Sequence, residues 1–182
     1  MYSGIESVLI SAEQLQSRIK ELGRQISADY ADKNWLLVGI LRGAAIFLAD
    51  LAREITVPVQ LDFLVVTRYG THDQPGEVKI IKDLDSSVKN RDLLLVEDVI
   101  DNGNTLHFLV ETLKLKNPRS IKICSLFDKP ERRTAPVKAD YLGFPLPDRF
   151  VVGFGLDYKQ KFRNLPYLAT LNPGSCTYEK EK

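Results

Sequence analysis

Acidic side chains and a glycine turn lie together near the middle of the chain. The segment LLLVEDVIDNGNTL places Glu97, Asp98 and Asp101 after an apolar run and before a helical pattern. Backbone N–H groups at a helix N-terminus bind phosphate, and Gly103 lets the backbone approach the anion closely. Carboxylates beside a phosphate need a further partner, either sugar hydroxyl groups or a hydrated Mg²⁺. Residues 97–105 therefore predict a site for a phosphorylated ribose.

Other phosphate motifs and a purely structural role are the alternatives for this turn. The chain lacks the G-x-x-x-x-G-K-S/T pattern of a Walker A loop, and one glycine does not make a dinucleotide-binding fingerprint. In the structural alternative, Asp101 or Asn102 is simply the N-cap of the next helix. Helix capping does not explain why three acidic residues follow an apolar strand. Their presence favours a functional site.

The apolar pattern predicts the elements that position the turn. Ser11 and Gln14 have capping-box spacing before a helix whose apolar residues recur every three or four positions. Continuous apolar runs are typical of strands that are buried on both faces. Such runs predict strands at residues 35–40, 59–67, 92–99 and 120–127, with helices up to Ile55 and over 102–116. This alternation predicts an α/β fold with a mostly parallel central sheet flanked by helices.

The remaining segments complete a single predicted domain of residues 1–182. Residues 78–81 predict the return strand of a hairpin, and the polar, Gly-containing residues 70–76 predict a mobile loop. Further on, the sequence predicts a Pro-rich link around 144–147, a strand over 149–155 and a last strand near 167–171.

Composition narrows the class of protein. The net charge of +1 argues against nucleic-acid binding through a broad basic surface. No apolar segment is long enough to span a bilayer, and no signal peptide is evident, so we expect a cytoplasmic protein. Cys124 lies in an apolar run and Cys176 near the polar C-terminus, so we expect neither a disulfide nor a zinc site.

Five motifs, in order along the chain, carry a resemblance to a known family. They are LRGA, TRYG, VEDVIDNGNTL, LFDKPERR and PDRFVVGFGLDYKQKFRNLPY. The acidic turn resembles the phosphoribosyl pyrophosphate motif of type I phosphoribosyltransferases. Over nearly its whole length the chain resembles the hypoxanthine-guanine phosphoribosyltransferases of purine salvage. The resemblance implies that family's fold, with a small hood formed by N- and C-terminal segments, and a homodimer or homotetramer.

The resemblance also implies a reaction. Ribose 5-phosphate passes from phosphoribosyl pyrophosphate to a ring nitrogen of a 6-oxopurine base, and pyrophosphate leaves. In the family pattern Glu97 and Asp98 contact the ribose hydroxyls, and Asp101 is the general base near the purine N7. The 5′-phosphate cradle corresponds to Asn102, Gly103, Asn104 and Thr105. Asn102 departs from the usual Thr or Ser, a change that a cradle built on backbone N–H groups should tolerate.

The later motifs imply the purine and metal contacts. Lys129 matches the lysine that donates to the purine O6, Phe150 the stacking aromatic, and Val151 the backbone that reads the purine edge. A cation facing O6 selects oxopurines over adenine. Asp157 matches an acid of the Mg²⁺ site. Judged by composition alone, Lys129 would be a solvated lysine and residues 150–154 an ordinary core strand.

The implied pyrophosphate contacts and covering loop include two further departures. Leu41, Arg42 and Gly43 match the pyrophosphate loop, in which a peptide bond is often cis and Lys is usual at the position of Arg42. Arg163 matches a second pyrophosphate contact. Arg68 and Tyr69 match the start of the mobile loop that closes over the site, where Ser-Tyr is more typical.

Two other functions stay open at this point. A regulatory protein on the same fold would read RNA or DNA, and it should show a basic face or an added DNA-binding helix pair. A pyrimidine or adenine transferase would share the acidic turn, but the Lys129 and Phe150 regions argue against it.

Overall fold

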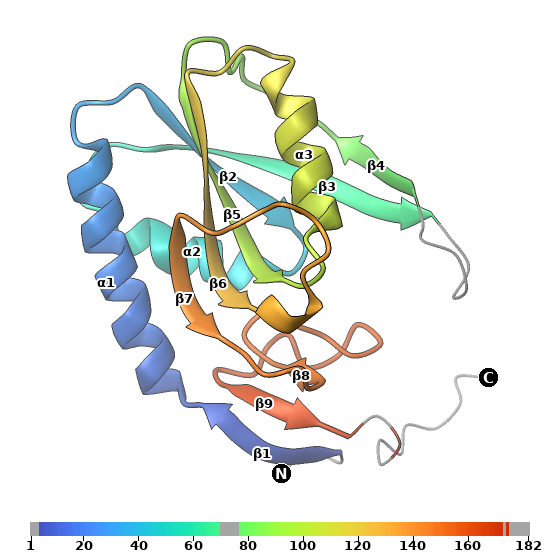
Figure 1. The fold of residues 1–182 in the computed structure, drawn as a ribbon. Helices are drawn as coiled ribbons and strands as arrows, with labels where there is room; N and C mark the ends of the chain where they lie inside the picture. Colours follow the sequence, from blue (N-terminus) through green and yellow to red (C-terminus); the bar gives the residue numbers. More distant parts are fainter. Residues whose placement is uncertain (1–3, 70–76, 173, 175–182) are drawn as a thin grey trace.

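The computed structural model describes residues 4–69, 77–172 and 174, and its centre is a six-stranded sheet (Figure 1). The strand order is β4-β3-β2-β5-β6-β7. The five strands from β3 to β7 are parallel, and only β4 runs antiparallel, as the return strand of a hairpin with β3. The strands are β2 Trp35–Leu41, β3 Gln60–Tyr69, β4 Glu77–Lys82, β5 Asp92–Ile100, β6 Ser120–Asp128 and β7 Tyr141–Pro145. The predicted α/β fold with a mostly parallel sheet is confirmed.

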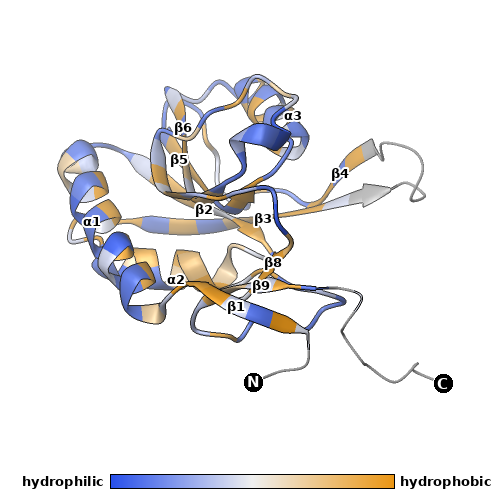
Figure 2. Cartoon of the chain, turned by 60° about the horizontal axis from the view of Figure 1, so that its bottom comes forward, coloured by the Kyte–Doolittle hydropathy of each residue, from blue (hydrophilic) through white to orange (hydrophobic). Residues whose placement is uncertain are grey.

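Helices cover both faces of this sheet. α1 (Ala12–Tyr30) and α2 (Ala45–Glu54) lie on one face, and α3 (Asn104–Lys114) lies on the other (Figure 2). The predicted start of α1 is confirmed, because the Ser11 side chain accepts from Gln14 N while Gln14 Oε1 accepts from Ser11 N. A short 3₁₀ helix, η1 (Pro130–Arg132), follows β6.

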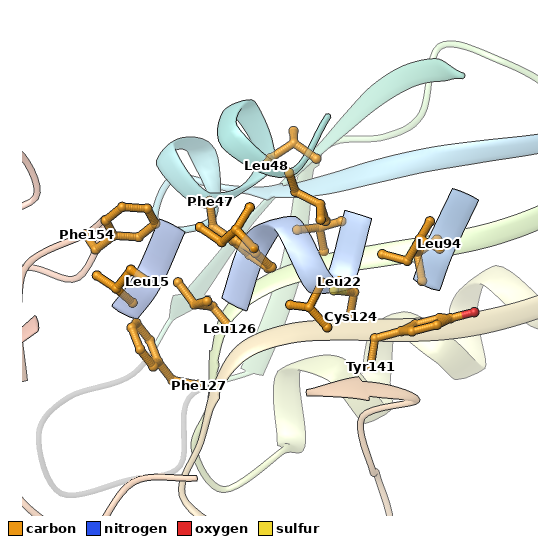
Figure 3. Close-up of a cluster of buried hydrophobic side chains, with 14 of the residues drawn as sticks. Leu15, Leu22, Phe47, Leu48, Leu94, Cys124, Leu126, Phe127, Tyr141 and Phe154 are labelled. Carbon is orange, nitrogen blue, oxygen red and sulfur yellow. The ribbon is translucent and has the colours of Figure 1, made fainter. Parts of the chain in front are cut away.

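Each face of the sheet carries its own apolar cluster, because alternate residues of a strand point to opposite faces. Leu36, Val38 and Ile40 of β2 pack in the cluster beneath α3. The opposite cluster joins the sheet to α1 and α2, as the apolar periodicity of α1 predicts. Figure 3 shows side chains of this second cluster, among them Leu15, Leu22, Phe47, Leu48, Cys124 and Leu126. Cys124 is fully buried, as its apolar surroundings predict.

A smaller, three-stranded sheet joins segments from near both ends of the chain. Its order is β1-β9-β8, and all its pairings are antiparallel. The strands are β1 Ile5–Ile10, β8 Val151–Val152 and β9 Leu168–Leu171. Val151, Phe154 and Leu168 belong to the same apolar cluster as α1 and α2, so this sheet is packed onto the main body.

Two predictions in the C-terminal part of the chain need correction, and one N-terminal strand was not predicted. The strand predicted over 149–155 shrinks to β8, because Gly153, Phe154 and Gly155 all have positive φ, which ends a regular strand. β7 lies where a Pro-rich link is predicted, and it extends the parallel sheet beside β6. β1 was not predicted at all, since its partner β9 is distant in the sequence.

The order of the strands fixes where a ligand should bind. The chain leaves β2 through α2 to one side and leaves β5 through α3 to the other, so the connections diverge between these adjacent strands. Ligands of open α/β sheets bind outside the carboxyl ends of the strands at such a switch point. Among the described residues, no helix is long and apolar enough to cross a membrane.

Candidate active site

A cavity of about 460 Å³ opens at the carboxyl ends of β2 and β5. This volume is within the range of small-molecule sites, roughly 300–1,000 Å³. β3 adds Val66 and Thr67 to its wall. Ten of the predicted site residues line it: Leu41, Arg42, Gly43, Glu97, Asp98, Asp101, Asn102, Gly103, Thr105 and Asp157.

The loop after β2 packs tightly against the end of β5. The peptide bond between Leu41 and Arg42 is cis. The cis bond of this loop therefore lies before Arg42. A Cβ atom on Gly43 would overlap the Asp98 carboxylate, and a Cβ on Gly155 would overlap the Gly43 carbonyl oxygen. Three segments therefore meet here with no space for a side chain between them, so both glycines are required by close approach.

The acids that end β5 are held in different ways. Asp98 is buried, and its Oδ1 accepts a hydrogen bond from Val99 N at 2.8 Å. Glu97 is partly buried, and its Oε1 accepts from Asp98 N at 3.1 Å. Neighbouring residues of a strand point to opposite sides, yet the cavity at the strand end touches both. The two carboxylates therefore line one cavity from different directions.

The start of α3 forms the next part of the cavity wall. Gly103 is the N-cap residue, with φ of +85° and no side-chain capping bond, so the alternative with Asp101 or Asn102 as N-cap is wrong. Asn102 instead accepts a hydrogen bond from Asn104 N through Oδ1, at 3.0 Å. Since Gly103 and Thr105 line the cavity, the positive end of the helix dipole faces it.

Asp157 lies in a network with two arginines. Its Oδ1 is 2.6 Å from Arg163 Nη2, and its Oδ2 accepts from Gln160 N at 2.8 Å. Gln160 Oε1 accepts from both Arg42 Nη1, at 3.1 Å, and Arg163 Nη2, at 3.2 Å. The side-chain oxygen of Gln160 thus holds the guanidinium groups of Arg42 and Arg163 beside Asp157.

The sequence and the fold both match known proteins. The profile of the phosphoribosyl transferase domain matches residues 11–159. The chain is 50% identical to the hypoxanthine-guanine phosphoribosyltransferase of Bacillus subtilis over 95% of this chain and 97% of that protein. It is 47% identical to the enzyme of the same name from Mycobacterium avium, over 95% of this chain and 89% of that protein.

This chain belongs to the hypoxanthine-guanine phosphoribosyltransferase family. The fold agrees: a crystal structure of a hypoxanthine phosphoribosyltransferase from Staphylococcus aureus superimposes with a TM-score of 0.90. That structure is 44% identical, and the match covers 94% of each chain. The resemblance first seen in five motifs is therefore confirmed over almost the whole chain.

Outside the cavity wall, the phosphoribosyltransferase fold gathers a second group of predicted residues. Lys129 is buried and donates to Arg149 O at 2.6 Å. Burial lowers the pKa of the Lys129 ammonium, because removing the charge from water outweighs the attraction of Asp101. Phe150 is 44% exposed and makes an edge contact with Tyr158, with ring centroids 5.5 Å apart. Val151 is buried in β8 beside it.

Two predicted residues of the phosphoribosyltransferase pattern lie partly outside the described structure. The backbone of Arg68 and Tyr69 ends β3, but their side chains are not among the described parts. Residues 70–76, predicted as a mobile loop, also lie outside the described residues.

Sequence reasoning missed three residues that hold this site together. Gln160 joins Arg42 to Arg163. Arg133 donates to the Asp101 carbonyl oxygen and to the Asp128 carboxylate. Arg132 Nε lies 3.0 Å from Asp101 Oδ1. The two arginines belong to a run, KPERR, that is typical of solvated surface charge, so their spacing offered no signal.

Proposed function

We propose that this protein transfers ribose 5-phosphate from phosphoribosyl pyrophosphate to a ring nitrogen of hypoxanthine or guanine. The products are pyrophosphate and the purine nucleoside monophosphate, IMP or GMP. The observation that carries the proposal is the cavity where the acidic end of β5, the N-terminus of α3 and two arginines meet. The relatives named above support the same activity.

The sugar phosphate would occupy the end of β5 and the start of α3. Glu97 and Asp98 accept hydrogen bonds from the ribose hydroxyls, for which two carboxylates at one strand end are suited. The 5′-phosphate lies at the helix N-terminus, where backbone N–H groups and the helix dipole favour an anion. Its cradle is formed by Asn102, Gly103, Asn104 and Thr105.

The pyrophosphate would lie between the loop after β2 and the network around Gln160. Leu41 and Gly43 bring the backbone to the leaving group, and Arg42 and Arg163 supply positive charge. Guanidinium groups bind phosphate oxygens through charge-assisted hydrogen bonds. Charge that develops on the departing pyrophosphate is therefore neutralised by groups that are already in place.

Mg²⁺ fits this donor set as part of the complex with phosphoribosyl pyrophosphate. Among the described residues, no group of three acids, histidines or cysteines is arranged to hold a metal ion. Mg²⁺ usually binds through one or two carboxylates plus substrate phosphates and water, so the single Asp157 carboxylate is a suitable protein ligand. When bound, the ion would neutralise phosphate charge and help orient the leaving group.

The purine base would lie against the second group of residues. Phe150 offers an exposed aromatic face for stacking, Lys129 donates to O6, and the backbone of Val151 reads the purine edge. Asp101 then accepts the proton that the purine loses at N7. Arg68 and Tyr69 begin the segment that we propose covers the site and excludes water during the reaction.

Two further inferences complete the proposal. We infer a homodimer or homotetramer, as the resemblance implies, and a cytoplasmic location, as expected from the sequence. The small-molecule partners are phosphoribosyl pyrophosphate and the oxopurine, with no nucleic acid or membrane partner.

A panel of bases tests the proposed reaction. Purified protein with phosphoribosyl pyrophosphate and Mg²⁺ should form nucleotide from hypoxanthine or guanine. Adenine should react about 10⁴-fold more slowly, because its amino group leaves the Lys129 donor unpaired. Reactions without phosphoribosyl pyrophosphate are the control. Absence of nucleotide with both oxopurines would contradict the proposal.

A further inference from the structure

Arg132 occupies a position between two carboxylates at the edge of the site. It ends the 3₁₀ helix η1, whose turn is closed by a 3.1 Å hydrogen bond from Arg132 N to Lys129 O. Its Nε lies 3.0 Å from Asp101 Oδ1, and its Nη1 lies 3.7 Å from Asp148 Oδ1. The closer contact is to Asp101, the residue assigned above to proton transfer.

The two oxygens of Asp101 have different surroundings. Oδ1 is buried, and within the described part of the chain it has no hydrogen-bond partner. Arg132 Nε is close to Oδ1 but is not aligned for a hydrogen bond. The contact therefore stabilises the carboxylate through attraction between opposite charges. The Asp101 side chain is nevertheless 43% exposed and lines the cavity. Because Oδ1 is buried, Oδ2 is the carboxylate oxygen that can face the cavity.

Neighbouring arginines hold different parts of Asp101. Arg133 donates to the Asp101 backbone carbonyl and pairs with Asp128, so it fixes the main chain. Arg132 reaches only the carboxylate. The backbone of Asp101 therefore keeps its anchor when Arg132 is removed, and the side chain loses its charged contact.

We propose that Arg132 is a positioning residue for Asp101, holding Oδ1 so that Oδ2 faces the incoming purine. The inference rests on the proposed role of Asp101 as general base. A general base must lie within hydrogen-bond reach of the proton that it accepts, and a displacement of about 1 Å costs on the order of 10²-fold in rate. A carboxylate that rotates freely about its Cβ–Cγ bond spends less time in the geometry needed to accept the proton.

Replacement of Arg132 gives the first test. Arg132→Gln should lower kcat roughly 10-fold or more with either oxopurine, while the KM for phosphoribosyl pyrophosphate stays within about twofold. Arg132→Lys should recover part of the loss, because it restores the charge. The Tm should stay within about 2 °C, since half-exposed ion pairs contribute little stability. Arg53→Gln, which breaks the pair between the exposed Arg53 and Asp50 on α2, is the control and should leave kcat unchanged.

A double variant separates positioning from other roles. If Arg132 acts through Asp101, Arg132→Gln should cause no further loss of kcat in an Asp101→Asn background. If the losses of kcat in the two single variants multiply in the double variant, the inference is overturned. It is also overturned if Arg132→Gln raises only the KM for the purine, because Arg132 would then contact the base itself. An Asp101→Asn protein with full turnover would instead refute the general-base role on which the inference depends.

Discussion

Gly43 and Asp98 come from different strand ends and lie so close that a single methyl group on Gly43 would overlap the carboxylate oxygen Oδ2. The carboxylate is also tied to its own strand, because Oδ1 accepts from Val99 N at 2.8 Å. Neither partner has room to move independently. The proposed ribose contact and the proposed pyrophosphate loop are therefore set by one shared packing contact.

Gly43→Ala should damage donor binding more than folding. The added methyl displaces either the Asp98 carboxylate or the loop after β2, so we expect the KM for phosphoribosyl pyrophosphate to rise about 10-fold or more and kcat to fall. Steady-state kinetics with varied donor would measure both. Gly174→Ala is the control, because its nearest neighbour among the described residues would be at 3.4 Å, an ordinary contact. Wild-type donor affinity in Gly43→Ala would show that this packing is not needed.

Asp101→Asn should separate chemistry from donor binding. The change keeps the shape of the side chain but removes its basicity, so kcat should fall about 10²–10⁴-fold. The donor should bind as before, since the cradle at α3 uses other groups. Single-turnover kinetics and direct titration with phosphoribosyl pyrophosphate would measure the two effects. Equal losses in both would mean that Asp101 has a structural role.

Asn102→Asp should weaken the phosphate cradle through charge alone. The carboxylate keeps the oxygen that accepts from Asn104 N, so the turn should persist. Its negative charge repels phosphate, and two unit charges 4 Å apart near a protein surface repel by about 4 kcal/mol. We expect the KM for phosphoribosyl pyrophosphate to rise at least about 10-fold, with a smaller rise at high salt.

The matched variant for this test is Asn102→Ser, which replaces the amide by a hydroxyl group. It should bind the donor within about threefold of wild type, because the hydroxyl adds no charge. Similar losses for the Asp and Ser variants would mean that the amide itself is required.

Lys129→Met should abolish oxopurine selection yet preserve or raise stability. Burial lowers the pKa of Lys129 in the folded protein, so its charged form opposes folding. That penalty is complete below the folded pKa and disappears as the pH rises toward 10.5, the ordinary value. Removing the charge should therefore raise the Tm at neutral pH, with a difference that shrinks in alkaline buffer.

Differential scanning calorimetry across this pH range would measure the effect. The Arg149 carbonyl that loses its donor belongs to an exposed residue, so water should replace the lost hydrogen bond. A variant that is less stable at neutral pH, with no dependence on pH, would show that the hydrogen bond outweighs the burial of charge.

Local patterns predicted most of the main sheet, because the physical cause of each element lies within its own residues. The β2 run is apolar at every position since both faces are covered, and α1 repeats its apolar residues at the helical period. The acidic turn was found for the same reason: the strand, the three acids, the glycine and the helix are consecutive in the sequence.

The remaining features depend on contacts between distant segments. β1 exposes most of its residues and exists because β9 pairs with it, which no local pattern reveals. The sequence pattern places Gly155 in a continuous strand, but its φ of +100° and its close approach to Gly43 arise from the packing of two loops. Arg132 and Gln160 have ordinary surface composition, and only the fold brings them to Asp101 and Arg42.

The pairing of β1 with β9 has a consequence for the far side of the site. β9 also pairs with β8, and β8 leads directly into the loop that carries Gly155 and Asp157. Through β9 and β8, β1 thus supports the side of the cavity that Asp157 lines. A fusion or deletion that displaces β1 should reduce donor affinity well before the six-stranded sheet unfolds. In protein engineering, the N-terminal strand should be treated as part of the catalytic architecture.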